Sequence, residues 1–164
     1  MRKIYIFLFT VLFFVLSVST RSFTSNAGDV TSYMPAEVKS LIDGIFSVNA
    51  TKRAEAAFKL GNLGEKAYQA TPFLLRMLDD NLPVWCRYDG QGTWTTPGKE
   101  AAKALVEIGK PSLQYILPLL ENDHPYISMN EYMERNLVYA LTRISGLKYG
   151  NDFGKWINWL KTLQ

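Results

Sequence analysis

The amino-acid sequence predicts an all-α fold. Apolar residues recur at intervals of three and four along most of the chain, which is the spacing of one helix face. Three segments, 54–81, 97–123 and 131–150, share this pattern, and the first helix of each ends at a glycine or a serine. No segment alternates polar and apolar residues regularly enough to predict a strand. The predicted architecture is a stack of similar helix pairs.

Residues 1–27 have the composition of a signal peptide. Arg2 and Lys3 precede the apolar run Ile4–Leu16, and no acidic residue occurs in this segment. Small residues before Gly28 favour cleavage after Ala27. The apolar run is shorter than the ~20 residues that cross a bilayer, so a cleaved leader is favoured over a membrane anchor.

The mature protein is therefore expected to be the segment 28–164, either periplasmic or secreted. A protein anchored in a membrane by its uncleaved leader is the alternative. The chain has 164 residues, with 18 Lys and Arg against 15 Asp and Glu, and the basic excess lies in the leader. The segment 28–164 is neutral, so it lacks the excess cations that drive nonspecific binding to nucleic acid. Nucleic acid is not an expected partner.

The segment 28–164 has the length of a single domain. Cys86 is the only cysteine, which excludes a disulfide within the chain and a cysteine-rich zinc or iron–sulfur site. The sequence contains no phosphate-binding glycine loop, zinc-ligand spacing or serine-nucleophile motif. No metal or cofactor is expected.

The first predicted helix covers residues 35–46, ahead of the repeats. In the first repeat, Gly64 can adopt the left-handed conformation that ends a helix. The apolar stripe of that helix, at i, i+4 and i+7, consists of Ala56, Leu60 and Leu63. A shorter and more apolar helix over 73–78 completes the pair.

The second repeat has clear signals at both ends of its first helix. Thr96 is a capping residue, and Pro97 occupies the first helical position, where its missing N–H costs nothing. Gly109 suits the end of this helix. A second apolar helix over 113–120 follows.

The third repeat is predicted to begin at Ser128 and Glu131, which have the spacing of a capping box. A last helix is predicted over 152–163. Trp156 and Trp159 stand three residues apart in it and face nearly the same way. We expect them to close the apolar end of the stack, and an aromatic docking surface is the alternative.

The repeated segments resemble bacterial HEAT-like repeats. The residues that carry the resemblance are AAFKLGNLG at 56–64, TPGKEAAKALVEIG at 96–109, ALTRISG at 140–146 and YGNDFGKWINW at 149–159. The resemblance implies a short right-handed α-solenoid of about three helix pairs with terminal capping helices. It also implies a surface that binds another molecule rather than a specific activity. The residues 84–88 depart from the family pattern and precede an insertion.

The inserted loop at 82–96 is the most informative segment for function. It contains four residues of types that are common in binding hot spots, namely Trp85, Arg87, Tyr88 and Trp94. Loops of this length often have a function in compact domains. We predict a binding site at these four residues. The alternative is that the two tryptophans fold back and cover the core.

Other polar residues give no strong sign of catalysis. A nucleophilic Cys86 would need a base, and the only histidine is His124. Three aspartates, Asp79, Asp80 and Asp89, lack the regular spacing of a calcium loop. The remaining carboxylates stand at helical spacing and are interpreted as solvent-facing: Asp43, Glu100, Glu107, Glu131 and Glu134.

The sequence therefore favours an exported, non-enzymatic repeat protein that binds a protein partner or acts as a scaffold. A module that binds a sugar or an apolar molecule through the aromatic loop is the second hypothesis. An enzyme is the third.

Overall fold

The computed structural model describes residues 34–88, 90–121 and 129–164. The predicted leader and His124 lie outside these residues. Met34–Gln164 forms one compact unit. Within the described part of the chain the structure is mainly α-helical, as predicted, but it also contains a two-stranded antiparallel sheet. The expectation that no strand forms was wrong.

The bounds of the elements agree closely with the predicted helices. The α-helices are α2 (Ala36–Ile45), α3 (Ala50–Asn62), α4 (Thr71–Arg76), α5 (Pro97–Ile108), α6 (Leu113–Glu121), α7 (Glu131–Ser145) and α8 (Phe153–Lys161). Short 3-10 helices cover Gly64–Ala70 and Lys110–Ser112. The strands are β1 (Val84–Tyr88) and β2 (Gln91–Thr95).

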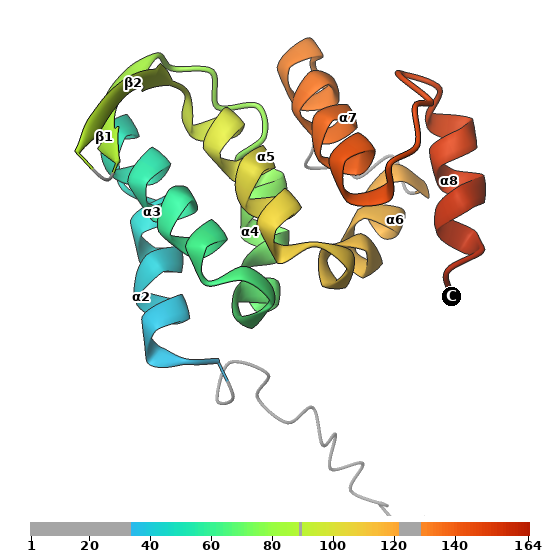
Figure 1. Ribbon diagram of the computed structural model, residues 1–164, viewed down its shortest axis with the longest axis horizontal. Helices are drawn as coiled ribbons and strands as arrows, with labels where there is room; N and C mark the ends of the chain where they lie inside the picture. Colours follow the sequence, from blue (N-terminus) through green and yellow to red (C-terminus); the bar gives the residue numbers. More distant parts are fainter. Residues whose placement is uncertain (1–33, 89, 122–128) are drawn as a thin grey trace, which may run out of the picture. The chain divides into compact units, whose positions relative to one another are not determined.

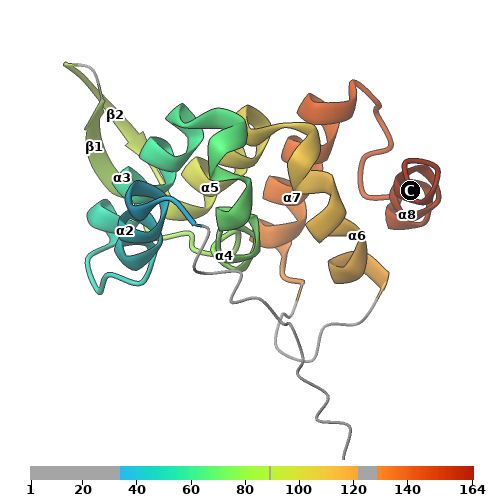
Figure 2. The same ribbon diagram turned by 90° about the horizontal axis from the view of Figure 1, so that it is seen from below.

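The helices form two layers. The first helices of the three repeats, α3, α5 and α7, lie side by side in chain order (Figure 1). On one side of them α2, α4 and α6 form the second layer (Figure 2). The last helix, α8, packs against α6. The core lies between the two layers.

Small side chains allow the first layer to pack closely. The contact between α3 and α5 is the most extensive between any two described helices. At its centre Gly61 faces Ala104, and a Cβ atom on Gly61 would lie 3.1 Å from the Ala104 Cα. Leu60 and Leu105 are fully buried in the same core. The alanines and glycine of the repeat pattern therefore set the distance between these two helices.

Helix ends follow the sequence signals with one exception. The Thr96 side chain accepts a hydrogen bond from the Lys99 N–H and caps α5, as predicted. Ser128, the predicted cap of α7, lies outside the described residues, and α7 begins at Glu131. Its cap is Asn130, whose side chain accepts a hydrogen bond from the Met133 N–H at 2.9 Å. Asparagine caps a helix as well as serine does, so the two positions could not be separated by residue type.

Trp156 ties α8 to the turn that precedes it. This side chain is fully buried, and its indole N–H donates a hydrogen bond to the Gly150 carbonyl at 2.8 Å. Trp159 packs edge-on against it and remains partly exposed. Trp156 is thus a core residue, as expected for a helix that closes an apolar end.

The structure contains no candidate membrane span within the residues it describes, because every helix there is too short or too polar to cross a bilayer.

Gly98 allows α4, α5 and α7 to meet closely, because it has no side chain. The Gly98 N–H donates a hydrogen bond to the Asp80 carbonyl at 2.8 Å. The Asn136 amide donates one to the Leu78 carbonyl at 2.7 Å. A Cβ atom on Gly98 would lie 2.6 Å from the Leu78 carbonyl oxygen and 2.9 Å from that of Asp80. Both obstacles are backbone atoms, which cannot yield without moving the chain.

We therefore expect Gly98→Ala to lower the free energy of unfolding by about 2 kcal/mol or more. The matched control is Gly154→Ala, since Gly154 is on the exposed side of α8 and has room for a methyl group. That change should raise stability by about 0.5–1 kcal/mol. Urea denaturation of both variants measures the difference. Equal effects of the two changes would contradict this packing.

Candidate functional site

The segment predicted as a loop is a β-hairpin. Val84 pairs with Thr95, and the register continues to Tyr88 opposite Gln91. Gly90, with a φ of 84°, lies in the turn between the strands. The alternation of this segment was missed because its outward positions carry tryptophan and arginine, so both faces of β1 contain large side chains.

The inner face of the hairpin anchors it to α3. Val84 and Cys86 are buried and form a small core with Ala54 of α3. The Tyr88 ring stacks on the Phe58 ring, with centroids 4.0 Å apart and planes 10° from parallel. Cys86 is therefore buried as a small apolar residue under the hairpin.

The outer face of the hairpin presents two indoles to solvent. Trp85 and Trp94 are paired across the strands, with ring centroids 5.5 Å apart and planes at 63°. Their exposed fractions are 50% and 69%. The alternative in which they fold back as core residues was wrong. Arg87 is exposed on the same face, because it stands two residues from Trp85 on β1.

Trp85 is also supported from below. A side chain on Gly92 would overlap the six-membered ring of Trp85, so this indole lies over the glycine. The Trp85 ring can take this position only because residue 92 has no side chain. The hairpin thus brings together three of the four predicted residues: Trp85, Arg87 and Trp94.

The fourth predicted residue, Tyr88, belongs to the anchoring face. Its hydroxyl is buried and has no hydrogen-bond partner among the described residues. Burial raises the pKa of the Tyr88 phenol, and the neighbouring Cys86 thiol and Glu100 carboxylate raise it further. Tyr88 is therefore a partly buried packing residue on the inner face, and it does not lie beside the two indoles.

Glu100 is a buried carboxylate, so its interpretation as solvent-facing was wrong. It is 1% exposed. Its Oε1 accepts a hydrogen bond from the Thr95 hydroxyl at 2.5 Å and one from the Lys103 ammonium at 2.8 Å. The first turn of α5 faces the base of the hairpin, which is why this position is enclosed. A buried carboxylate needs such partners, and here they connect β2 to the exposed side of α5.

Asp79 and Asp80 lie in different surroundings. Asp80 is paired with Arg53, with 2.7 Å between Oδ2 and Nε, and Asp79 is exposed. Asp89 lies outside the described residues. Nowhere in the described ranges do three or more histidine, cysteine, aspartate or glutamate side chains gather as ligands.

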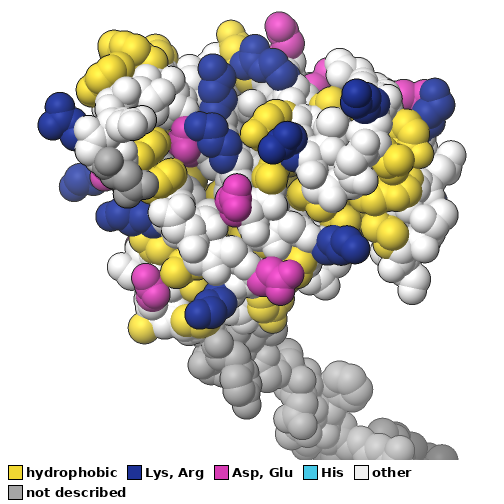
Figure 3. Space-filling model, viewed as in Figure 1, with side chains coloured by type: hydrophobic (Ala, Val, Ile, Leu, Met, Phe, Trp, Pro, Cys, Tyr) yellow, Lys and Arg dark blue, Asp and Glu magenta, His cyan; other side chains and the backbone are white. Residues whose placement is uncertain are grey.

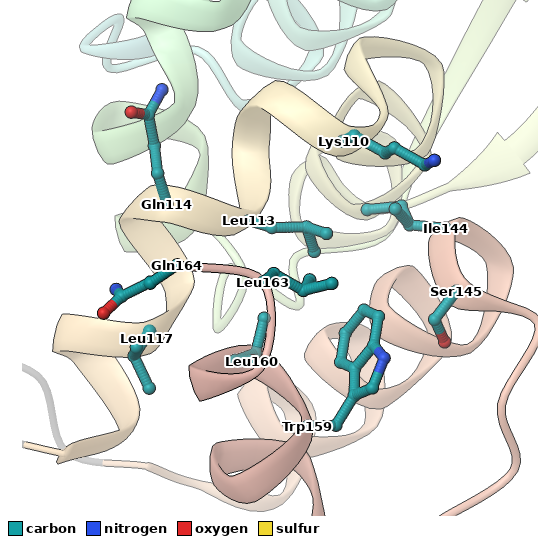
Figure 4. Close-up of a pocket in the computed structure, with 10 residues that line it drawn as sticks. All are labelled: Lys110, Leu113, Gln114, Leu117, Ile144, Ser145, Trp159, Leu160, Leu163 and Gln164. Carbon is teal, nitrogen blue, oxygen red and sulfur yellow. The ribbon is translucent and has the colours of Figure 1, made fainter.

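The hollows between the helices were not predicted from the sequence. One, of about 480 Å³, lies between α6, α7 and α8 (Figure 4). Leu113, Ile144 and Trp159 point into it, and Lys110 lies at its rim. Its lining residues come from three successive helices and depend on how these helices pack, so no local pattern indicates it.

A second hollow, of about 260 Å³, is a groove between α5 and α7. Its lining residues are Lys99, Ala102, Lys103, Arg135, Asn136 and Tyr139. Figure 3 shows Lys and Arg side chains gathered over this part of the layer formed by α3, α5 and α7. The groove is basic at its rim and apolar inside.

No protein-family model matches the sequence, and neither a curated protein nor a solved structure matches it significantly.

The packing of the hairpin gives a direct test through its single thiol. Since Cys86 is buried under the hairpin, its reaction with a thiol reagent requires the hairpin to leave α3. We expect the native thiol to react far more slowly than the thiol of the urea-unfolded protein. Phe58→Ala, which removes the stacking partner of Tyr88, should accelerate the native reaction about tenfold.

Tyr132→Ala is the control, because Tyr132 is an exposed aromatic residue on α7 away from the hairpin. This variant should leave the thiol rate unchanged. A native thiol that reacts as fast as the unfolded one would show that the hairpin does not cover it.

Proposed function

We propose that this protein is an exported, non-enzymatic scaffold module that binds a protein partner through the outer face of the hairpin. Its helices would form a short right-handed α-solenoid of about three HEAT-like pairs, with the terminal helices as caps. The order of α3, α5 and α7, side by side in one layer, supports this arrangement. Such solenoids present surfaces to other molecules.

The exposed indole pair is the observation that carries the proposal. Burying one indole removes a large apolar area from water, yet Trp85 and Trp94 both remain at least half exposed. Tryptophan and arginine are the residues most enriched at the centres of protein interfaces. Arg87 on the same face completes this combination. A partner that covers the face would recover the free energy lost by exposing the two rings.

The anchoring of the hairpin also supports a binding role. The inner face is fixed by the Ala54 core and by the stack of Tyr88 on Phe58. The indoles are therefore held in place before any partner arrives, and less conformational entropy is lost on binding. A surface with this rigidity favours a defined protein epitope.

Export is proposed from the leader sequence. A chain with one cysteine is suited to an oxidising compartment when that thiol cannot form a wrong disulfide. Cys86 meets this condition, because it is 1% exposed.

A position-specific crosslinking experiment tests the function. Benzoylphenylalanine is introduced in place of Trp85, Trp94 or Leu163 in the full chain, which is expressed in its source cell and irradiated. Leu163 is the control, because it is an exposed apolar residue that follows α8, at the end of the structure opposite the hairpin (Figure 1). We expect positions 85 and 94 to give the same adduct of defined mass and position 163 to give none.

A second arm keeps the photoprobe at position 85 and adds Trp94→Ala. Loss of the second indole should reduce the adduct about tenfold or more, since each aromatic hot spot contributes ~2 kcal/mol. Adducts of equal yield at all three positions, or none at 85 and 94, would contradict the proposed binding surface.

A further inference from the structure

The groove between α5 and α7 has a lining of positive charge only. Three of its six lining residues are cationic, Lys99, Lys103 and Arg135, and none is acidic. The chain outside the leader has equal numbers of basic and acidic residues, so this local excess is not an effect of composition. A concentration of one charge in a hollow attracts groups of the opposite charge.

Two of the three cations are available to a ligand. Lys103 is paired with the buried Glu100, so its charge is partly compensated. Lys99 and Arg135 are exposed and form no ion pair with a described residue. The Arg135 guanidinium lies 5.3 Å from the centre of the Tyr132 ring, which orients it on the surface of α7.

The interior of the groove is suited to the stem of an amino-acid side chain. Ala102 and Tyr139 line it, and the Tyr139 ring is 44% exposed. Asn136 is fixed at its base by the hydrogen bond to the Leu78 carbonyl. An aliphatic stem can lie against Ala102 and the tyrosine ring while a carboxylate reaches Lys99 and Arg135.

The groove is also connected to the hairpin. Glu100 links the Thr95 hydroxyl on β2 to Lys103 at the edge of the groove. Another hollow, between α3 and α5, shares Lys103 and Tyr139 with the groove and extends to Phe58, which stacks on Tyr88 of the hairpin. The basic groove therefore continues to the inner side of the hairpin, the side opposite the indoles.

We infer that the groove between α5 and α7 binds an acidic segment of the protein partner, with glutamate or aspartate carboxylates at Lys99 and Arg135. This inference rests on the proposed function only in taking the partner to be a protein. A nucleic acid is a less suitable occupant, because the groove is short and the body of the protein is neutral.

Fluorescence anisotropy of the full chain with labelled hexaglutamate tests the inference. The test variant is Lys99→Gln/Arg135→Gln. The matched control is Lys39→Gln/Lys52→Gln, which removes the same charge from exposed positions on α2 and α3. We expect the test variant to raise the Kd for hexaglutamate about tenfold, and the control to change it less than about twofold. Hexaglutamine should bind neither protein.

Three results would overturn the inference: equal losses in the two variants, equal affinity for hexaglutamine, or tighter binding of an oligothymidylate with the same number of charges. Trp94→Ala should leave hexaglutamate binding unchanged, because Trp94 does not line the groove. Crosslinking that fails at the hairpin while peptide binding persists would count against the proposed function alone. Crosslinking at the hairpin without hexaglutamate binding in the groove would count against the inference about the groove alone.

Discussion

The close contact of α3 with α5 is the constraint on which the rest of the structure depends. Gly61 and Ala104 bring the two helix backbones together at the centre of the layer. The hairpin packs against α3 through β1. At the base of the hairpin, Thr95 donates a hydrogen bond to Glu100 in the first turn of α5. A larger side chain at Gly61 would separate the helices and displace both. The position of the hairpin thus follows from small residues in the helical core.

The hairpin has two faces with opposite roles. Val84, Cys86 and Tyr88 bury one face against α3, and this burial compensates for the exposure of Trp85 and Trp94 on the other. A two-stranded hairpin is only marginally stable alone in water, so it needs the helix beneath it. Its rigidity therefore comes from α3 and not from the strands themselves.

The sequence predicts the helices well because their apolar spacing and caps are local signals, as Thr96 and Gly109 show. It misses the hairpin because tryptophan at outward positions conceals the alternation of β1. The sequence predicts a solvent-facing Glu100 because a carboxylate at helical spacing is usually exposed. The burial of Glu100 depends on the hairpin, which places the Thr95 hydroxyl beside it. The two hollows are absent from any sequence reading, since their linings come from separate helices.

The central claim is that the hairpin is an integral part of the helical body, which holds its indoles in a fixed, exposed position. Native-state hydrogen exchange measures this directly. The account predicts that the paired amides of β1 and β2 exchange with nearly the same opening free energy as the central amides of α3 and α5. Hairpin amides that exchange orders of magnitude faster than those of α3 would show a loosely attached segment and contradict the account.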